Sequence, residues 1–351
     1  MDERAQDIET QGRARGQRPE QAVAFRPPQG FDATVGGELP PRIDEAAWRP
    51  APEPPAPKRS ERLKQAALDK TPERFRGPTD LQVRIRTGVI YIAITVVCIL
   101  LGAIPTVLML SVTAGFCAGE FYYMLRKDAK LPNEILGIVA AVLYPPAMFF
   151  FGMAGIAAVA FVFLIALLVW YVFYSRARVS DVGVSFFGAA YTGMLLSPLV
   201  IVRMALDSPI WSGVLVLGIF ISVWANDSFA YLVGSKLGKH KLAPRLSPKK
   251  SWEGFFAGLV ASMIFWSLMM FIPGVQMSLV QALPFGLVCG LMGVLGDLAE
   301  SRVKRNSGCK DSGTMMPGHG GLLDRCDSLF LASATSSLLL LVGGCIPNLV
   351  F

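Results

Sequence analysis

The chain has 351 residues, of which 53% are hydrophobic, a mean hydropathy of +0.48 and a formal net charge of +7. Soluble domains are roughly 45–50% apolar with glycine included, so this composition excludes an ordinary soluble enzyme. The six cysteines show no Cys-x-x-Cys pair and no regular spacing, which argues against a zinc site or a disulfide framework. We therefore expect an all-α, polytopic membrane protein.

The first eighty residues differ from the rest of the chain. Residues 1–80 contain 12 of the 24 prolines together with 14 basic and 14 acidic side chains. Such a segment buries too little apolar surface to offset the entropy of ordering, and we predict a disordered, Pro-rich cytoplasmic tail. The remaining 19 basic and 12 acidic side chains carry the whole net charge of +7, so the membrane part and its loops face something anionic.

Long apolar runs recur through the rest of the chain. A hydrocarbon core about 30 Å thick requires roughly 20 apolar residues per helix. On this measure we predict a helical bundle with about nine spans, divided into N-terminal helices in 81–205 and a C-terminal catalytic region in 206–351. The predicted spans lie near 86–104, 106–124, 134–151, 154–174, 184–204, 211–233, 254–273, 279–299 and 328–347.

Basic loops predict the orientation of the bundle. Short loops rich in Lys and Arg remain cytoplasmic, and an inside N-terminus places every basic loop inside, leaving outside few charges besides Arg203 and Asp207. The predicted topology is N-in and C-out. A compact chain with nine spans suits a prokaryotic inner membrane. We therefore expect a multi-pass protein of that membrane, with an active site that faces the cytoplasm.

Two acidic residues lie inside apolar spans, where a carboxylate costs about 2.5–3.5 kcal/mol on insertion scales. Asp227 and Asp297 stand near the predicted cytoplasmic ends of their spans, and we interpret them as facing a cavity or a cation. Glu120 has no such neighbourhood, and its simplest expected partner is a nearby base. Glycines at 286, 290, 293 and 296 favour close helix packing or, alternatively, room for a ligand beside Asp297.

The loop between 233 and 254 is strongly basic. It could be an orienting or lipid-binding patch, but Ser247-Pro-Lys-Lys250 presents a hydroxyl and two ammonium groups rigidly, and Ser251 begins a helix whose N-terminal amides favour phosphate. We predict that Ser247, Lys249 and Lys250 bind substrate phosphate.

A dense block of charge follows the eighth predicted span. No P-loop motif occurs, so phosphates must be held by metal and basic side chains, and the block supplies carboxylates that suit Mg²⁺. His319 lies in a glycine-rich turn, and we favour a ligand or loop-positioning role over that of a base. The predicted phosphate-binding residues here are Ser301, Lys304 and Arg305, and the predicted catalytic residues are Asp297, Lys304, Arg305, Lys310, Asp311, His319, Asp324, Arg325 and Asp327.

These motifs resemble the phosphatidate cytidylyltransferase family. The likeness rests on Ser301-x-Val-Lys-Arg305, Lys310-Asp-x-Gly313 and Pro317-x-His-Gly-Gly-Leu-x-Asp-Arg-x-Asp327, with similar segments at 227–234 and 247–254. It implies an enzyme of phospholipid biosynthesis that converts phosphatidate and CTP into CDP-diacylglycerol and pyrophosphate.

The resemblance also implies cofactors and partners. It implies Mg²⁺, with K⁺ as a second cation that could assist, a homodimer in the lipid bilayer and no nucleic-acid partner. By resemblance the metal ligands are Asp297 and Asp324, with Asp227 as a further candidate. Two alternatives remain at this point: a CTP-dependent polyprenol or lipid-alcohol kinase, which needs a base, and a cation-coupled transporter.

Overall fold

The structure is a computed structural model that describes residues 80–126, 131–244, 246–313, 315–316 and 320–346. The predicted tail lies outside these residues. The described part is helical apart from one short β-hairpin, in agreement with the all-α prediction. The elements are α3 (Asp80–Leu101), α4 (Ala103–Arg126), α5 (Glu134–Phe173), α6 (Val179–Ala189), a π-helical turn (Ala190–Met194), α7 (Leu199–Met204), α8 (Pro209–Leu237), β1 (Lys241–Ala243), β2 (Ser247–Ser251), α9 (Trp252–Met269), α10 (Leu279–Asn306) and α11 (Leu323–Val342).

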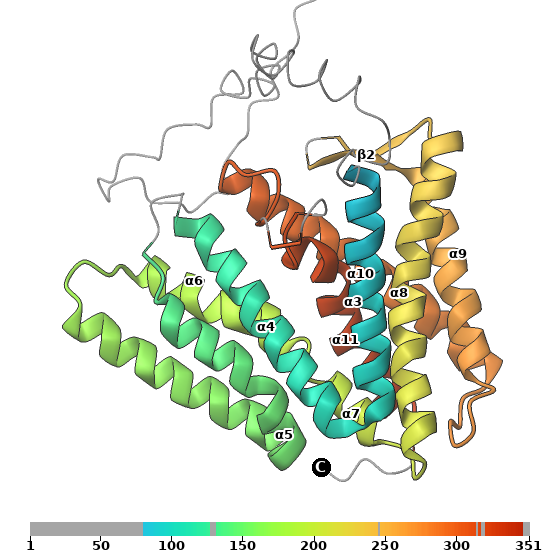
Figure 1. Cartoon of the computed structure of the whole chain (residues 1–351), viewed down its shortest axis with the longest axis horizontal. Helices are drawn as coiled ribbons and strands as arrows, with labels where there is room; N and C mark the ends of the chain where they lie inside the picture. The colour runs from blue at the N-terminus through green and yellow to red at the C-terminus, as the bar shows by residue number, and fades with distance from the viewer. Residues whose placement is uncertain (1–79, 127–130, 245, 314, 317–319, 347–351) are drawn as a thin grey trace, which may run out of the picture. The chain divides into compact units, whose positions relative to one another are not determined.

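The helices have the lengths and composition of a polytopic membrane bundle. Within the described chain, seven helices are long and apolar enough to cross a membrane, and α3 has a shorter apolar stretch, Ile85–Leu101. Helix α5 contains both predicted spans 134–151 and 154–174, and the chain reverses between them at Gly152, whose φ is 59° (Figure 1). Nine spans and the N-in orientation stay predictions.

Local sequence signals begin several helices. Asn133 precedes α5 and accepts a hydrogen bond from the Leu136 amide at 3.1 Å, and Ser251 precedes α9 and accepts from the Gly254 amide at 3.3 Å. Pro209 opens α8, where its missing N–H costs no hydrogen bond. Ser251 is also the last residue of β2, so its hydrogen bond to Gly254 fixes how β2 leads into α9.

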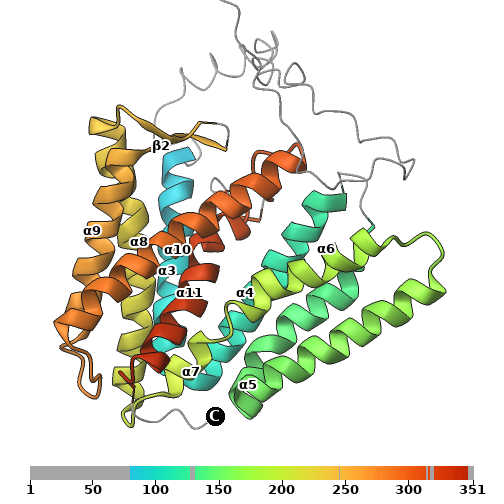
Figure 2. The ribbon, with the colours of Figure 1, turned by 180° about the vertical axis from the view of Figure 1, so that it is seen from behind.

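Helices α10 and α11 lie between two groups of helices, one formed by α3, α8 and α9 and the other by α4, α5 and α6 (Figures 1 and 2). Glycines permit the close approach of α10 to its neighbours. A Cβ at Gly286 would lie 2.6 Å from the Met263 Cα of α9, and one at Gly296 would overlap the Asp327 carbonyl of α11. Close helix packing thus explains these two glycines.

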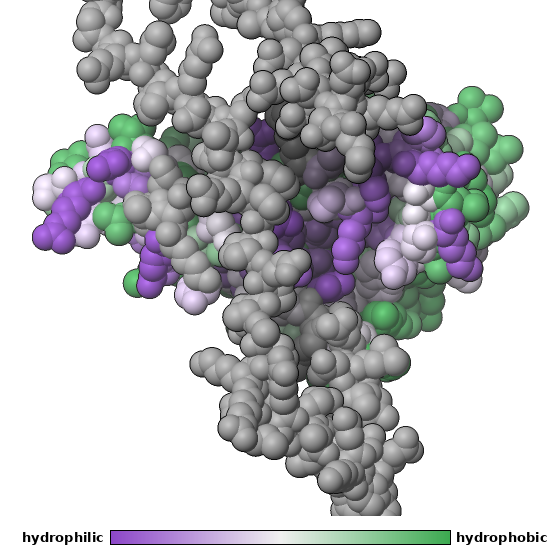
Figure 3. Space-filling model, turned by 90° about the horizontal axis from the view of Figure 1, so that it is seen from above, coloured by the Kyte–Doolittle hydropathy of each residue, from purple (hydrophilic) through white to green (hydrophobic). Residues whose placement is uncertain are grey.

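The β-hairpin extends the polar end of the bundle. Strands β1 and β2 pair antiparallel, and the Trp252 amide donates to the His240 carbonyl at 2.9 Å. The His240 Nδ1 and Glu253 Oε1 atoms are 2.8 Å apart, which ties the hairpin to the first turn of α9. Seen from this end, hydrophilic side chains gather on the exposed face (Figure 3). The hairpin holds Lys250 over the bundle.

Candidate active site

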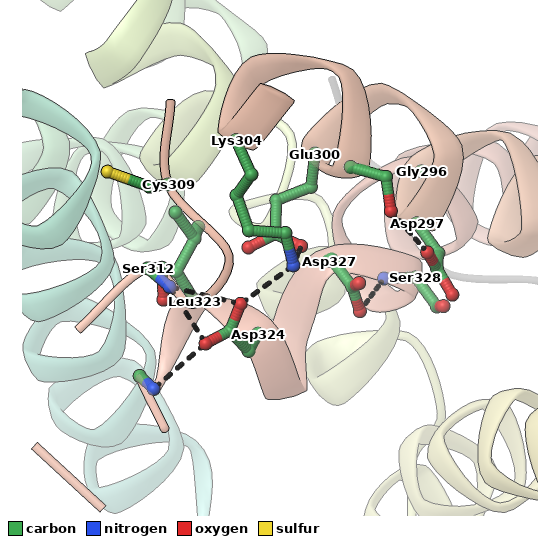
Figure 4. Close-up of polar contacts among 12 residues, drawn as sticks. Gly296, Asp297, Glu300, Lys304, Cys309, Ser312, Leu323, Asp324, Asp327 and Ser328 are labelled. Carbon is green, nitrogen blue, oxygen red and sulfur yellow. Dashed lines mark hydrogen bonds and ion pairs between the residues drawn. The ribbon is translucent and has the colours of Figure 1, made fainter. Parts of the chain in front are cut away.

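Several of the predicted site residues lie together at the hairpin end of the bundle. The last turns of α10, the described residues of the loop between α10 and α11, and the first turns of α11 lie together there (Figure 4). Two groups of charged side chains can be distinguished. The aspartate group comprises Asp227, Asp297 and Asp327, and the ion-pair triad comprises Glu300, Lys304 and Asp324.

The aspartate group brings one carboxylate from each of three helices. The Lys250 ammonium of β2 lies 2.7 Å from Asp297 Oδ2, and both side chains are about a quarter exposed. Asp297 Oδ1 accepts a hydrogen bond from the Ser301 hydroxyl at 3.2 Å. The exposed Asp227 carboxylate interacts electrostatically with Asp297 and with Lys250. Segments far apart in the sequence therefore meet here.

Asp327 completes this group from α11. Its side chain is only 9% exposed, its Oδ1 accepts from the Ser328 amide at 2.7 Å, and it interacts electrostatically with Asp297 and Asp227. Among the three carboxylates, Asp297 is ion-paired with Lys250 and Asp227 interacts with it electrostatically, whereas the electrostatic neighbours of Asp327 are acidic. This excess of negative charge favours a bound cation.

The donors in the aspartate group fit Mg²⁺ but do not form a closed cage. In the part of the chain that the structure describes, no three His, Cys, Asp or Glu side chains are arranged to hold a metal by themselves. Mg²⁺ usually takes one or two carboxylates and completes its octahedral shell with water and substrate phosphate. Asp297 and Asp227 supply two carboxylates of that kind, and a magnesium site here stays a prediction.

The ion-pair triad is more deeply buried. The Lys304 ammonium lies 2.6 Å from Glu300 Oε2 and 2.8 Å from Asp324 Oδ1. The Glu300 side chain is 1% exposed and those of Asp324 and Lys304 are 9% and 13% exposed. The positive charge of Lys304 is therefore neutralised inside the protein, although the sequence indicated a phosphate-binding role. Sequence reasoning assigned no role to Glu300.

Two described residues of the loop between α10 and α11 bind the carboxylate of Asp324. Asp324 Oδ2 accepts from the Ser312 amide at 3.0 Å and from the Gly321 amide at 2.9 Å. Gly320 has φ of 91°, and a Cβ there would lie 2.9 Å from Asp324 Oδ2. In Figure 4, Asp324 lies on the loop side of Lys304 and Asp297 lies beyond Asp327. The structure thus separates the two acids that the resemblance pairs as metal ligands, and that pairing stays a prediction.

Glu120 of α4 also contacts this loop. Its Oε2 accepts from the Leu323 amide at 2.8 Å and from the Ser312 hydroxyl at 3.2 Å. Among the described residues these partners are an amide and a hydroxyl rather than the base that we expected. An acid near the end of an apolar run was the only sequence signal for this contact.

Most of the other predicted site residues lie on the exposed surface or outside the described part. Arg305 donates from Nη1 to the Cys309 carbonyl at 3.5 Å. Ser247 is partly buried, whereas His319 lies outside the described residues. The exposed members are Lys249, Arg305, Lys310, Asp311 and Arg325.

A cavity of about 1030 Å³ opens beside the loop. Val112, Phe116 and Ile138 of α4 and α5 line its apolar side, and Lys310 and Asp311 line its polar side. A second, mostly apolar cavity of about 630 Å³ lies between α3 and α4 and shares Val112 and Phe116 with the first. The two cavities thus combine apolar walls with a charged rim.

The arrangement of these residues agrees with comparisons to known proteins. The cytidylyltransferase family matches residues 82–342, a range that contains both charged groups and the loop between them. The chain belongs to the cytidylyltransferase family. Residues 1–80, the predicted tail, precede the family match.

Three similar proteins are phosphatidate cytidylyltransferases by name. The chain is 32% identical over 254 residues to the phosphatidate cytidylyltransferase of Bacillus subtilis, a match that covers 71% of this chain and 93% of that protein. It is 45% identical over 122 residues to the phosphatidate cytidylyltransferase of Staphylococcus aureus strain COL, covering 35% and 47% of the two chains. The Staphylococcus haemolyticus protein of that name is 43% identical over 122 residues, with the same two coverages.

Proposed function

We propose that this cytidylyltransferase-family protein is a phosphatidate cytidylyltransferase that converts CTP and phosphatidate into CDP-diacylglycerol and pyrophosphate for phospholipid biosynthesis. The observation that carries the substrate assignment is the cavity beside the loop, where Lys310 stands at one side and Val112 and Phe116 at the other. A lipid with an anionic headgroup matches this pairing of charge with apolar surface. The names of the relatives support the same reaction.

The chemistry requires positioning and charge neutralisation more than proton abstraction. The phosphate oxygen of phosphatidate is ionised near neutral pH and attacks the α-phosphorus of CTP, forming a new P–O bond while the bond to the pyrophosphate oxygen breaks in line. Exposed cations at Lys249, Arg305 and Lys310 are available to neutralise the phosphates. Lys304, neutralised by two carboxylates, holds Asp324 in place.

Cations complete the proposal. Mg²⁺ would be held by Asp297 and Asp227, and when bound it supplies charge neutralisation at the phosphates. The proposal includes K⁺ as a second cation and a homodimer in the bilayer. A metal bound to Asp324 would compete with the Lys304 ammonium and two backbone amides, from which this carboxylate already accepts hydrogen bonds.

Labelled CTP tests the reaction directly. Detergent-purified protein is incubated with phosphatidate, Mg²⁺ and CTP labelled on the α- or the γ-phosphate, as wild type, Asp297→Asn and Glu134→Gln. The control is matched, because the Asp297 and Glu134 side chains are 26% and 25% exposed and each is ion-paired. We expect the α-label in lipid, the γ-label in pyrophosphate, at least a roughly 100-fold lower rate for Asp297→Asn, and an unchanged rate for Glu134→Gln.

Other outcomes would replace the proposal. Parallel reactions contain diacylglycerol or a polyprenol in place of phosphatidate, and transfer of the γ-label to either lipid would identify a lipid kinase. No turnover with any of these lipids would favour a transporter that binds cations at the aspartate group.

A further inference from the structure

Glu120 connects the N-terminal half of the chain to the loop between α10 and α11. It lies 203 positions before Leu323, whose amide donates to Glu120 Oε2 at 2.8 Å. The Ser312 hydroxyl donates to the same oxygen at 3.2 Å. One carboxylate oxygen thus holds two points of the loop, close to where it enters α11.

This contact supplies a cap that α11 lacks locally. The first amides of a helix have no intrahelical acceptor, and Leu322, at the N-cap position, offers no side-chain hydrogen bond. Leu323 is the first residue of α11. A carboxylate at a helix N-terminus stabilises it through the hydrogen bond and the helix dipole. Glu120 therefore caps, from another helix, the helix that carries Asp324 and Asp327.

The loop is shaped closely around Glu120. A Cβ at Gly313 would lie 2.5 Å from Glu120 Oε1, and a Cβ at Gly321 would lie 2.5 Å from Glu120 Oε2. Ser312 links this contact to the triad, because its amide bonds Asp324 at 3.0 Å while its hydroxyl bonds Glu120. A continuous path of contacts runs from Glu120 through Ser312 and Asp324 to Lys304.

We propose that Glu120 is a positioning residue, which fixes Ser312 and the start of α11 against α4 and thereby sets the place of Asp324 and of the charged rim of the cavity. Glu120, Lys310 and Asp311 line the same cavity. The kinetic consequence rests on the proposed cytidylyltransferase reaction, whereas the effect on the loop does not.

Hydrogen–deuterium exchange and kinetics together test this role. We compare Glu120→Ala, Glu120→Gln and the control Glu134→Ala, following exchange in peptides spanning 308–326 of the substrate-free full-length protein. Glu120→Ala removes both hydrogen bonds, and we expect exchange in 308–326 to become about tenfold faster, with kcat/KM about 10- to 100-fold lower. Glu120→Gln keeps one acceptor oxygen, and we expect its exchange in 308–326 and its kcat/KM to be much closer to the wild-type values than those of Glu120→Ala. Glu134→Ala should change neither the exchange in 308–326 nor kcat/KM.

A second pair of variants tests the path through Ser312. Ser312→Ala removes the hydrogen bond between the Ser312 hydroxyl and Glu120. The double variant Glu120→Ala with Ser312→Ala should differ little from Glu120→Ala in exchange and in kcat/KM, because both changes remove the same contact. Unchanged exchange in 308–326 for Glu120→Ala and Ser312→Ala would overturn the proposal. So would equal kinetic losses in Glu120→Ala and Glu120→Gln with unchanged exchange, which would indicate direct participation in the reaction. If the wild type does not turn over phosphatidate and CTP, the proposed function fails and the exchange data alone decide the role of Glu120.

Discussion

Lys304 is held by one carboxylate from its own helix and by one from the helix that follows it. Lys304 pairs with Glu300 four residues earlier and with Asp324 twenty residues later, in a setting that is almost closed to solvent. A buried ion pair is weak evidence for stability in itself, because desolvation offsets much of its attraction. Removing one partner is different, because the remaining charges stay buried without compensation.

Replacing Lys304 should therefore destabilise the protein strongly. We expect Lys304→Met to lower the free energy of unfolding by about 3–5 kcal/mol, because two carboxylates lose their shared cation. Thermal unfolding in detergent, followed by tryptophan fluorescence, measures the change. Arg126→Met is the control: Arg126 is 62% exposed and pairs with Glu134, so its loss should cost at most about 1 kcal/mol. Equal melting temperatures for the two variants would contradict the compensating role of Lys304.

At the scale of helices, glycines determine how closely the elements approach. Gly296 of α10 faces the Asp327 carbonyl of α11, whereas Gly183 of α6 has no atom within 4 Å of the position that a Cβ would occupy. The same residue type thus has opposite roles in two helices. Contact with a neighbouring backbone, rather than helix propensity, decides the cost of a substitution.

Alanine at these two positions should have opposite effects. Gly296→Ala forces α10 away from α11, and we expect the free energy of unfolding to fall by about 1–3 kcal/mol. Gly183→Ala should stabilise α6 by about 0.5–1 kcal/mol, because alanine has the higher helix propensity. Melting temperatures measured in one detergent compare the two. A Gly296→Ala variant as stable as the wild type would contradict the close contact of α10 with α11.

Gly152 has a third role, in the reversal within α5. Its φ of 59° and ψ of −143° belong to a region that is essentially restricted to glycine, and a Cβ added there would have no atom within 4 Å. Gly152→Ala should lower the free energy of unfolding by about 1–3 kcal/mol through backbone strain alone. A melting temperature unchanged from that of the wild type would show that the turn accepts another conformation.

At the scale of the whole molecule, hydropathy and charge predict an orientation. The basic loops, including the hairpin with Lys249 and Lys250, lie on one side when the N-terminus is inside. Hydrophilic side chains gather at the hairpin end of the bundle (Figure 3). The proposed reaction, which uses cytoplasmic CTP, needs this end to face inward.

Reporter fusions test the orientation. With the topology N-in and C-out, alkaline phosphatase fused after Phe351 should be active in bacterial cells, and the same reporter inserted in the basic loop near Arg245 should be inactive. Expression levels of both fusions, measured by immunoblot, serve as the control. The reverse pattern of activity would contradict the predicted topology.

Composition, apolar runs and motifs were sufficient to predict the membrane class, the helical architecture, the family likeness and the segments that form the candidate site. These features are local, and motifs such as Lys310-Asp-x-Gly313 can be read directly along the chain. The role of Ser251 as the residue before α9 was predictable for the same reason, since a helix cap needs only near neighbours.

Which charges meet is visible only in the folded protein. Lys250 pairs with Asp297, Lys304 with Glu300 and Asp324, and Glu120 reaches Leu323 across 203 positions. The Lys304–Glu300 pair follows from helical i,i+4 spacing within α10. The other contacts depend on how β2, α4, α10 and α11 pack, and no local pattern encodes that packing. The same physical reason explains why the sequence led us to expect a basic partner for Glu120 and not the Leu323 amide: the order of residues in a motif does not set proximity in the folded bundle.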